Sequence, residues 1–272
     1  FGLPCFHPVG AKRFVGAVHK CVDSREAVSY PVTMSSLRIQ HLNCATMCPV
    51  GASMLTGHNQ FVCHCLLVET DEGLVLVDTG LGTDDVTGTH DHPLSFELFL
   101  RPELSAEETA LHQIRETGYN PADVRHIVLT HLDIDHAAGL ADFPEATVHV
   151  HRAEDEFRRN GGLTAGTRHV PEQWGHDPDW RFYEPDGESW FDFEAVRQLD
   201  GLPPEILLIP LVGHSPGHSG VAIDTGNGWL LHAGDAFFDQ AEIAADGPGS
   251  TFMLRAFQRF LDTDHRARVH NQ

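Results

Sequence analysis

The pattern of apolar and polar positions predicts strands and helices that alternate along the chain. Short apolar runs bounded by turn-forming or charged residues are typical of strands, and they occur at residues 61–68, 74–77, 127–129, 146–151, 205–213, 221–224 and 229–235. The first two of these strands flank the tight turn Asp71-Glu72-Gly73, which predicts a hairpin. The strands fall into two similar halves, and each half ends in polar loops that carry His and Asp.

Three segments have apolar residues at helical spacing. In segment 104–120, Ser105 is placed as an N-cap, Glu108 follows three residues later and Gly118 comes after the end, so we expect a capped helix. A short charged helix is predicted at 152–160, and a further helix is predicted in the terminal segment 251–272.

Residues 161–204 show no clean period and are rich in Gly, Pro, Trp and His. A long irregular segment inside a compact domain is commonly a loop that covers a substrate. We therefore expect a lid or pocket wall here, with Trp174 and Tyr183 lining a substrate pocket.

Composition narrows the classes of ligand. The formal charge of -21 argues against nucleic acids and anionic membranes, because both would be repelled, and it favours small molecules and metal cations. No apolar stretch approaches the roughly 20 residues that span a bilayer. The six cysteines are too dilute in 272 residues for a disulfide scaffold, and reduced thiols fit a cytoplasmic enzyme. We expect a small-molecule substrate and allow for a homodimer.

Both ends of the sequence bear on domain organisation. The chain starts at Phe1, and Met34 would make a natural start, so residues 1–33 are interpreted as a leader or a non-native extension. Residues 34–272 are expected to form a single domain. Its helical tail ends at Gln272 without a following strand, so we expect the natural domain to continue further.

The candidate chemistry begins with "THLDIDHAAG", residues 130–139, directly after an apolar run. His131 and Asp133 alternate as they would on an extended loop, while Asp135 and His136 can turn toward a second point nearby. Four ligands of this type facing one cavity suit a metal ion. The alternative is that Asp135 only caps a helix starting at His136 and the others are solvated.

Two later loops favour the metal interpretation. In "GHSPGHSG", His218 follows a predicted strand among glycines that allow a tight turn, and Asp235 ends the next pair of strands in "HAGD", 17 residues further on. Three strand ends that each carry His or Asp after an apolar run predict a metal centre.

Together, "HLDIDH", "GHSPGH" and "HAGD", preceded by "LVLVDTG", resemble the metallo-β-lactamase superfamily over about residues 36–262, and its lactonase-like hydrolases in particular. The resemblance implies an α/β fold, a four-layer αβ/βα sandwich with metals at one edge. It also implies roles for residues of this chain: metal one held by His131, Asp133 and His218, metal two by Asp135 and His136, Asp235 bridging, and Asp78 and His214 orienting the ligands.

Two features depart from the family pattern. Asp133 stands where the family usually has His, so the ligand set would hold three carboxylates, and we expect Mn or Fe to be tolerated beside Zn. The last histidine for metal two normally follows the terminal helix and is absent, so a weak second site is expected.

We expect a metal-activated water to attack a small ester, most plausibly a lactone, with Asp135 passing a proton to the leaving group and Asp235 holding the metals. Hydrolysis of phosphoesters, phosphotriesters or sulfate esters on the same centre is the alternative, with promiscuity between these classes. A non-hydrolytic iron redox protein is a third hypothesis.

Overall fold

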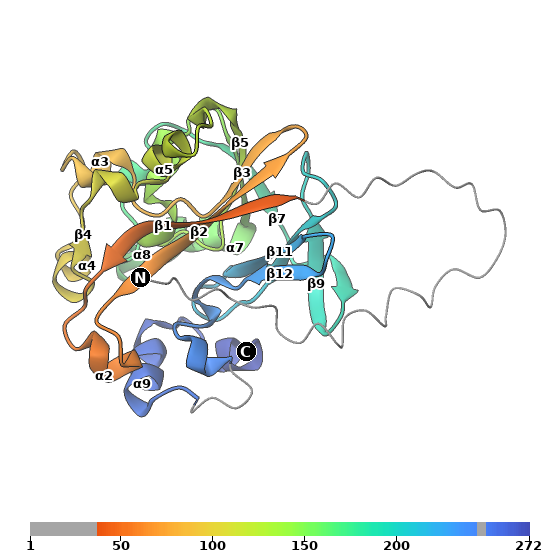
Figure 1. Ribbon diagram of the computed structural model, residues 1–272. Helices are drawn as coiled ribbons and strands as arrows, with labels where there is room; N and C mark the ends of the chain where they lie inside the picture. The colour runs from red at the N-terminus through yellow and green to blue at the C-terminus, as the bar shows by residue number, and fades with distance from the viewer. Residues whose placement is uncertain (1–36, 244–248) are drawn as a thin grey trace.

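The computed structural model of the chain describes residues 37–243 and 249–272, and the predicted leader at 1–33 lies outside them. Within the described residues, two β-sheets stack face to face and helices cover the outer sides (Figure 1). No described helix is long and apolar enough to cross a membrane. The layers are the helix, sheet, sheet, helix order that the family resemblance implied.

The larger sheet has seven strands in the order β4-β1-β2-β3-β5-β6-β7. Its strands are β1 (Arg38–Met47), β2 (Phe61–Thr70), β3 (Gly73–Val77), β4 (Pro102–Glu103), β5 (Val124–Val128), β6 (Thr147–His151) and β7 (Asp179–Tyr183). The hairpin β2–β3 is antiparallel, as predicted, whereas β3, β5, β6 and β7 run parallel. The carboxyl ends of the parallel strands therefore meet at one edge, which is where ligands bind in open α/β sheets.

The smaller sheet has five antiparallel strands in the order β12-β11-β10-β9-β8. These strands are β8 (Glu188–Trp190), β9 (Phe193–Gln198), β10 (Ile206–Pro210), β11 (Ser219–Asp224) and β12 (Trp229–His232). Its inner face packs on the larger sheet, where Val77 and Val128 meet Leu208 and Val221 in one buried cluster. This shared apolar layer fixes one sheet against the other, because apolar surface removed from water stabilises by about 25 cal/mol per Å².

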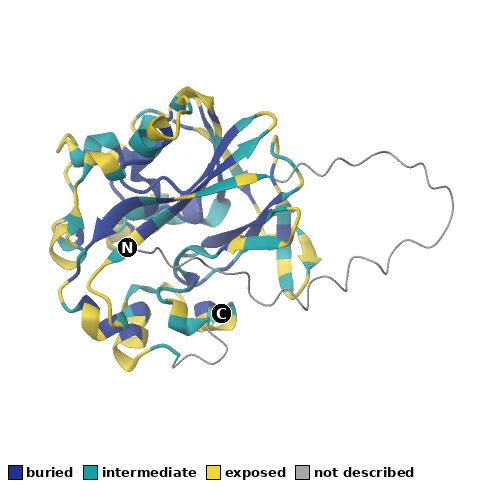
Figure 2. Ribbon diagram, in the orientation of Figure 1, coloured by how far each residue is buried: buried dark blue, intermediate teal, exposed yellow. Residues whose placement is uncertain are grey.

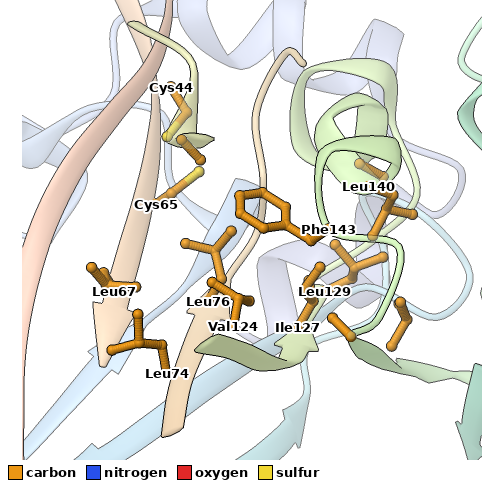
Figure 3. Close-up of a cluster of buried hydrophobic side chains, with 14 of the residues drawn as sticks. Cys44, Cys65, Leu67, Leu74, Leu76, Val124, Ile127, Leu129, Leu140 and Phe143 are labelled. Carbon is orange, nitrogen blue, oxygen red and sulfur yellow. The ribbon is translucent and has the colours of Figure 1, made fainter. Parts of the chain in front are cut away.

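Helices cover the other face of the larger sheet. They include α3 (Thr83–Val86), α4 (Leu94–Phe99), α5 (Ala110–Glu116), α6 (Ile134–Ala137), α7 (Arg152–Asn160) and α8 (Gly162–Gly166). A second buried cluster lies beneath them, and Figure 3 shows Cys44, Cys65 and Phe143 among its members. The helices α2 (Ala52–Thr56), α9 (Phe252–Leu261) and α10 (His265–His270) lie beyond the smaller sheet, and Figure 2 shows buried and exposed sides on them.

Two expectations about secondary structure were wrong. Ser105 makes no capping hydrogen bond from its side chain; the cap of α5 is Thr109, whose hydroxyl accepts from the His112 amide at 3.2 Å. Glu108 instead accepts from the Thr46 amide at 2.7 Å, so it links the helix to β1. Residues 161–204 are no irregular lid, since they contain α8, β7, β8 and β9. Their predicted place in a pocket wall agrees with the structure, where Arg168, Trp190 and Phe193 line the groove at the centre.

Candidate metal centre

The candidate centre lies where consecutive strands end. β3 ends just before Asp78, β5 is followed by the loop 130–136, and β10 and β12 are followed by the loops that carry His214 and Asp235. Because the two sheets stack with these ends together, residues that lie more than 100 positions apart in the sequence meet.

Three residues bring potential ligand atoms together. One ligand atom each from His131, His214 and Asp235 lies within 4.8 Å of the others. His131 is fully buried, and its Nε2 has no hydrogen-bond partner among the described residues. A buried polar atom without a partner is costly, and two imidazole nitrogens with one carboxylate oxygen are the donor types of a zinc site. These residues therefore fit a divalent metal ion.

His136 approaches the same centre from the other side of Asp235. Its Nε2 lies 3.2 Å from Asp235 Oδ1, and its Nδ1 lies 2.8 Å from Asp78 Oδ2. Asp78 also accepts from the amide and hydroxyl of Thr130, so it fixes the ring of His136 and the start of the loop together. This is the arrangement of a carboxylate that orients a ligand imidazole.

Asp135 completes the acidic side of the centre. Its Oδ2 lies 3.7 Å from His136 Nε2. Burial, together with the charges of Asp235 and Asp133, raises the pKa of Asp135 to about 6 despite the opposing effect of His136. Burial likewise lowers the pKa of His131 to about 4, which keeps its ring neutral and able to donate a lone pair.

Asp133 has a partner that the sequence analysis missed. Arg168, in the loop after α8, donates from Nε to Asp133 Oδ1 at 2.8 Å and from Nη2 to Oδ2 at 2.6 Å. Burial alone would raise the pKa of Asp133, but Arg168 and His131 hold it well below its usual value. No motif marked Arg168, because it lies 35 residues from Asp133 in the sequence.

The two histidines of "GHSPGH" have different surroundings, and the ligand role predicted for His218 stays a prediction. His218 donates from Nδ1 to the Leu211 carbonyl at 2.9 Å, and its Nε2 accepts from the Asp235 amide at 2.9 Å. Both of its ring nitrogens therefore contact backbone groups in this structure, as Nε2 of His214 contacts Nη2 of Arg168 at 2.7 Å. His214 is the histidine that faces His131 and Asp235. His218 instead holds the backbone of Asp235 in place.

Two buried carboxylates behind the centre also escaped the sequence analysis. Glu154, in α7, accepts from the Leu132 amide at 3.0 Å, the Ser215 hydroxyl at 2.6 Å and the Gly217 amide at 2.7 Å, so it ties the two histidine loops together. Asp262, after α9, lies 3.8 Å from His214 Nδ1. Their signal was weak, since each acidic residue stood in a charged helical segment.

The centre opens into a large groove of about 2440 Å³. Its walls include ten Phe and Trp side chains, namely Phe61, Phe96, Phe99, Trp190, Phe193, Trp229, Phe237, Phe238, Phe257 and Phe260. Trp174 and Tyr183, the predicted pocket residues, do not line it. Trp174 packs against the hydrophobic core beneath the helices. The Tyr183 hydroxyl forms hydrogen bonds with His149 and with the Asp200 amide, so both side chains contribute to the protein interior and not to the groove.

The sequence matches the model of the metallo-beta-lactamase superfamily over residues 58–267. The chain belongs to this superfamily. The predicted fold and family are thereby confirmed, and the histidine and aspartate loops described above lie within the matched range.

The relatives support the assignment of the chain as a metallo-hydrolase. A probable metallo-hydrolase of Mycobacterium tuberculosis is 42% identical over 238 residues, which cover 87% of this chain and 74% of the relative. An N-acyl homoserine lactonase of Bacillus cereus is 28% identical over 193 residues, 69% of each chain.

Solved structures agree on the fold. An N-acyl homoserine lactone hydrolase, solved with its product N-hexanoyl-L-homoserine at the catalytic metal centre, superposes with a TM-score of 0.62 at 23% identity, covering 86% of this chain and 84% of that one. A dizinc quorum-quenching lactonase gives a TM-score of 0.52 at 17% identity, covering 86% and 81%.

Proposed function

We propose that this metallo-hydrolase opens lactones or cleaves other small neutral esters that carry an apolar group. The observation that carries the proposal is that His214 and Asp235, which form the donor cluster with the buried His131, line a groove that also contains ten Phe and Trp side chains. The lactonase names among the relatives support the same substrate class.

In this proposal the chain's own residues hold one divalent ion and orient the substrate. His131, His214 and Asp235 supply the donors, and two imidazoles with one carboxylate suit Zn and also Fe, so we propose Zn with Fe or Mn tolerated in its place. When bound, such an ion supplies Lewis acidity and makes water nucleophilic at neutral pH. Asp135 lies beside His136 at the mouth of the groove and supplies a carboxyl group that can pass a proton to the leaving alkoxide.

The charges along the groove favour neutral substrates. Among the described residues that line it, Arg168 is the only Arg or Lys, and its guanidinium is already bound to Asp133. Acidic side chains that line the same groove are Asp133, Asp135, Asp192, Glu194, Asp235, Asp239 and Glu242. A phosphate monoester or a sulfate ester would meet this negative field without a free cation, so the groove disfavours both.

The proposal is tested by assaying one zinc-loaded preparation on three substrates of similar apolar size: a lactone, a neutral phosphotriester and a phosphate monoester. We expect kcat/KM to be highest for the lactone. A phosphotriester rate more than about a hundredfold above the lactone rate, about 2.7 kcal/mol in barrier, would instead make the protein a phosphotriesterase. A preference for the monoester would contradict the reasoning from groove charge.

A further inference from the structure

The outer side of helix α9 is apolar although it faces solvent. Phe252 and Phe260 are 78% and 82% exposed, Met253 is 45% exposed, and Ala256 is exposed as well. Their spacing places these four side chains on one side of the helix, which lies at the edge of the molecule (Figure 1). We call these four residues the α9 face. Single exposed apolar side chains are common, but a group of them on one helix indicates an interaction surface.

The α9 face is continuous with the groove. Phe257 and Leu261 of the same helix line the groove, and Phe260 belongs to both surfaces. Phe238 lies between Phe257 and the centre, since its ring centroid is 6.2 Å from that of Phe257 and 5.9 Å from that of His214. An aromatic path therefore runs from the candidate metal centre to the α9 face, and an apolar substrate held at that face can enter the groove without crossing water.

Two arginines border the α9 face. Arg255 and Arg259 are exposed and lie one helical turn apart along one of its edges. Neither forms an ion pair with another residue of the described chain. A helix with aromatic residues on one side and arginines beside them is typical of helices that lie on a lipid surface. There the rings enter the headgroup region while the guanidinium groups reach the phosphate oxygens.

Size and charge favour a lipid surface over a second copy of this chain. A fully covered Phe ring buries about 150–250 Å², so Phe252 and Phe260 offer roughly 300 Å². Each partner of a stable dimer buries about 800 Å², and a second copy with the same charge of -21 would be repelled. A lipid surface accepts a small protruding face, because binding follows the apolar area that enters it. The net charge opposes anionic membranes too, so zwitterionic headgroups fit best.

We propose that the α9 face docks the protein on a lipid surface with zwitterionic headgroups, and that the groove receives its apolar ester directly from that surface. Phe252, Met253 and Phe260 enter the headgroup region, and Arg255 and Arg259 contact its phosphates. The delivery of the ester rests on the proposed function, whereas the docking does not depend on which bond is cleaved.

The test of docking is flotation of the full chain with phosphatidylcholine vesicles on a density gradient, which gives a partition coefficient. Wild-type protein should float with the vesicles. The double variant Phe252→Ser, Met253→Ser removes apolar side chains that do not line the groove, and it should lower the partition coefficient at least about tenfold. Arg255→Gln, Arg259→Gln should lower it about threefold. Leu163→Ser is the matched control, because Leu163 is 94% exposed but lies on α8, and it should change nothing.

Hydrolysis gives a second measurement with the same double variant. On a water-soluble short-chain ester, Phe252→Ser, Met253→Ser and wild type should have equal kcat/KM, which also shows that the variant is folded. On a long-chain lactone dissolved in phosphatidylcholine vesicles, the variant should be at least about tenfold slower, because it no longer reaches the surface that holds the substrate.

The outcomes separate docking from catalysis. Folded wild type that does not float, or that floats no better than Phe252→Ser, Met253→Ser or loses as much in Leu163→Ser, would overturn the docking. A dimer in light scattering that the double variant dissociates would assign the α9 face to a second copy and overturn it as well. Equal rates of wild type and variant on the vesicle-bound lactone would overturn the delivery. Flotation without hydrolysis of any ester would overturn the proposed function and leave the docking in place.

Discussion

Replacing Asp78 with Asn tests how the fold orients the metal centre. Asp78 is fully buried and its Oδ2 accepts from Nδ1 of His136, whose Nε2 faces Asp235. Despite burial, the carboxylates of Asp235, Asp135 and Asp78 raise the pKa of His136 well above its usual value, so a metal ion would have to displace the proton on Nε2 while Asp78 keeps the proton on Nδ1. In Asp78→Asn, an amide N–H turned toward this ring makes Nδ1 the acceptor, so the proton moves to Nε2. The ring would then present a proton to the centre in place of a lone pair. Asp78 has a φ of 56°, which Asn tolerates, so backbone strain is not the cause.

The size of the effect follows from the contacts that are lost. In the wild type, the Thr130 amide donates to Asp78 Oδ1 at 2.7 Å, and the oxygen of Asn can still accept this bond. The variant loses the charge-assisted bond between the carboxylate and His136. Such a bond contributes about 1.5–3 kcal/mol. In a domain of this size that loss lowers Tm by roughly 3–12 °C. Disturbing a carboxylate that orients a ligand histidine typically costs about 10–100-fold in metal affinity or activity, and we expect the upper end.

A matched control exists elsewhere in the chain. Asp85 is also buried, and its Oδ1 lies 2.9 Å from His92 Nε2, outside the donor cluster. Asp85→Asn should lower Tm by a similar amount and leave zinc affinity unchanged. The assay is a zinc titration of kcat/KM on both variants beside thermal unfolding. Equal zinc affinities in folded Asp78→Asn and Asp85→Asn would refute the tautomer argument.

Four other changes have expected outcomes. His214→Ala should lower the zinc content measured by mass spectrometry, whereas His218→Ala should mainly lower Tm, because its ring binds only backbone. Glu154→Gln places an amide against one of three donors and should destabilise the fold by about 2 kcal/mol in chemical denaturation; unchanged stability would contradict its role in joining the loops. Phe238→Ala should raise KM for long-chain esters more than for short ones. The pKa of Asp78 is lowered in the folded protein, despite burial, chiefly by His136; its stabilising contribution is therefore present above its unfolded value near 4 and is lost as the pH falls further. The Tm difference between wild type and Asp78→Asn should shrink in that acid range.

Periodicity and turn residues were enough to predict much of the fold. The hairpin of β2 and β3 and the strands that precede each histidine loop follow from local patterns, because each strand is a short apolar run that becomes buried. The helix α7 follows from its charged helical segment, although the residues it buries are Glu154 and Asp155. The strands at 179–198 were missed because they are short and their aromatic residues do not alternate cleanly. The position of Tyr183 in the interior depends on its bonds to His149 and Asp200, which are distant in the sequence and leave no local signal.

The same distinction applies to the candidate site: residues placed by a local pattern could be predicted, and residues placed by contacts distant in the sequence could not. The loops that carry His131, His136 and Asp235 could be predicted, because each follows an apolar strand. Which histidine of "GHSPGH" lies beside Asp133 could not, since His214 contacts the side chains of Arg168 and Asp133, which are distant in the sequence. The role of Arg168 could not be predicted either. Arg168 contacts Asp133 because α8 and α9 pack against the loops, and no local sequence pattern near either residue indicates this contact.

The most direct measurement for the whole account is lactone hydrolysis by metal-stripped protein during a stepwise zinc titration. We predict no activity without zinc, a rise in proportion to added zinc, and a plateau at one zinc per chain. Lactone hydrolysis that persists in stripped protein, or that stays absent at every zinc concentration while the protein remains folded, would contradict the assignment of a zinc-dependent lactone hydrolase.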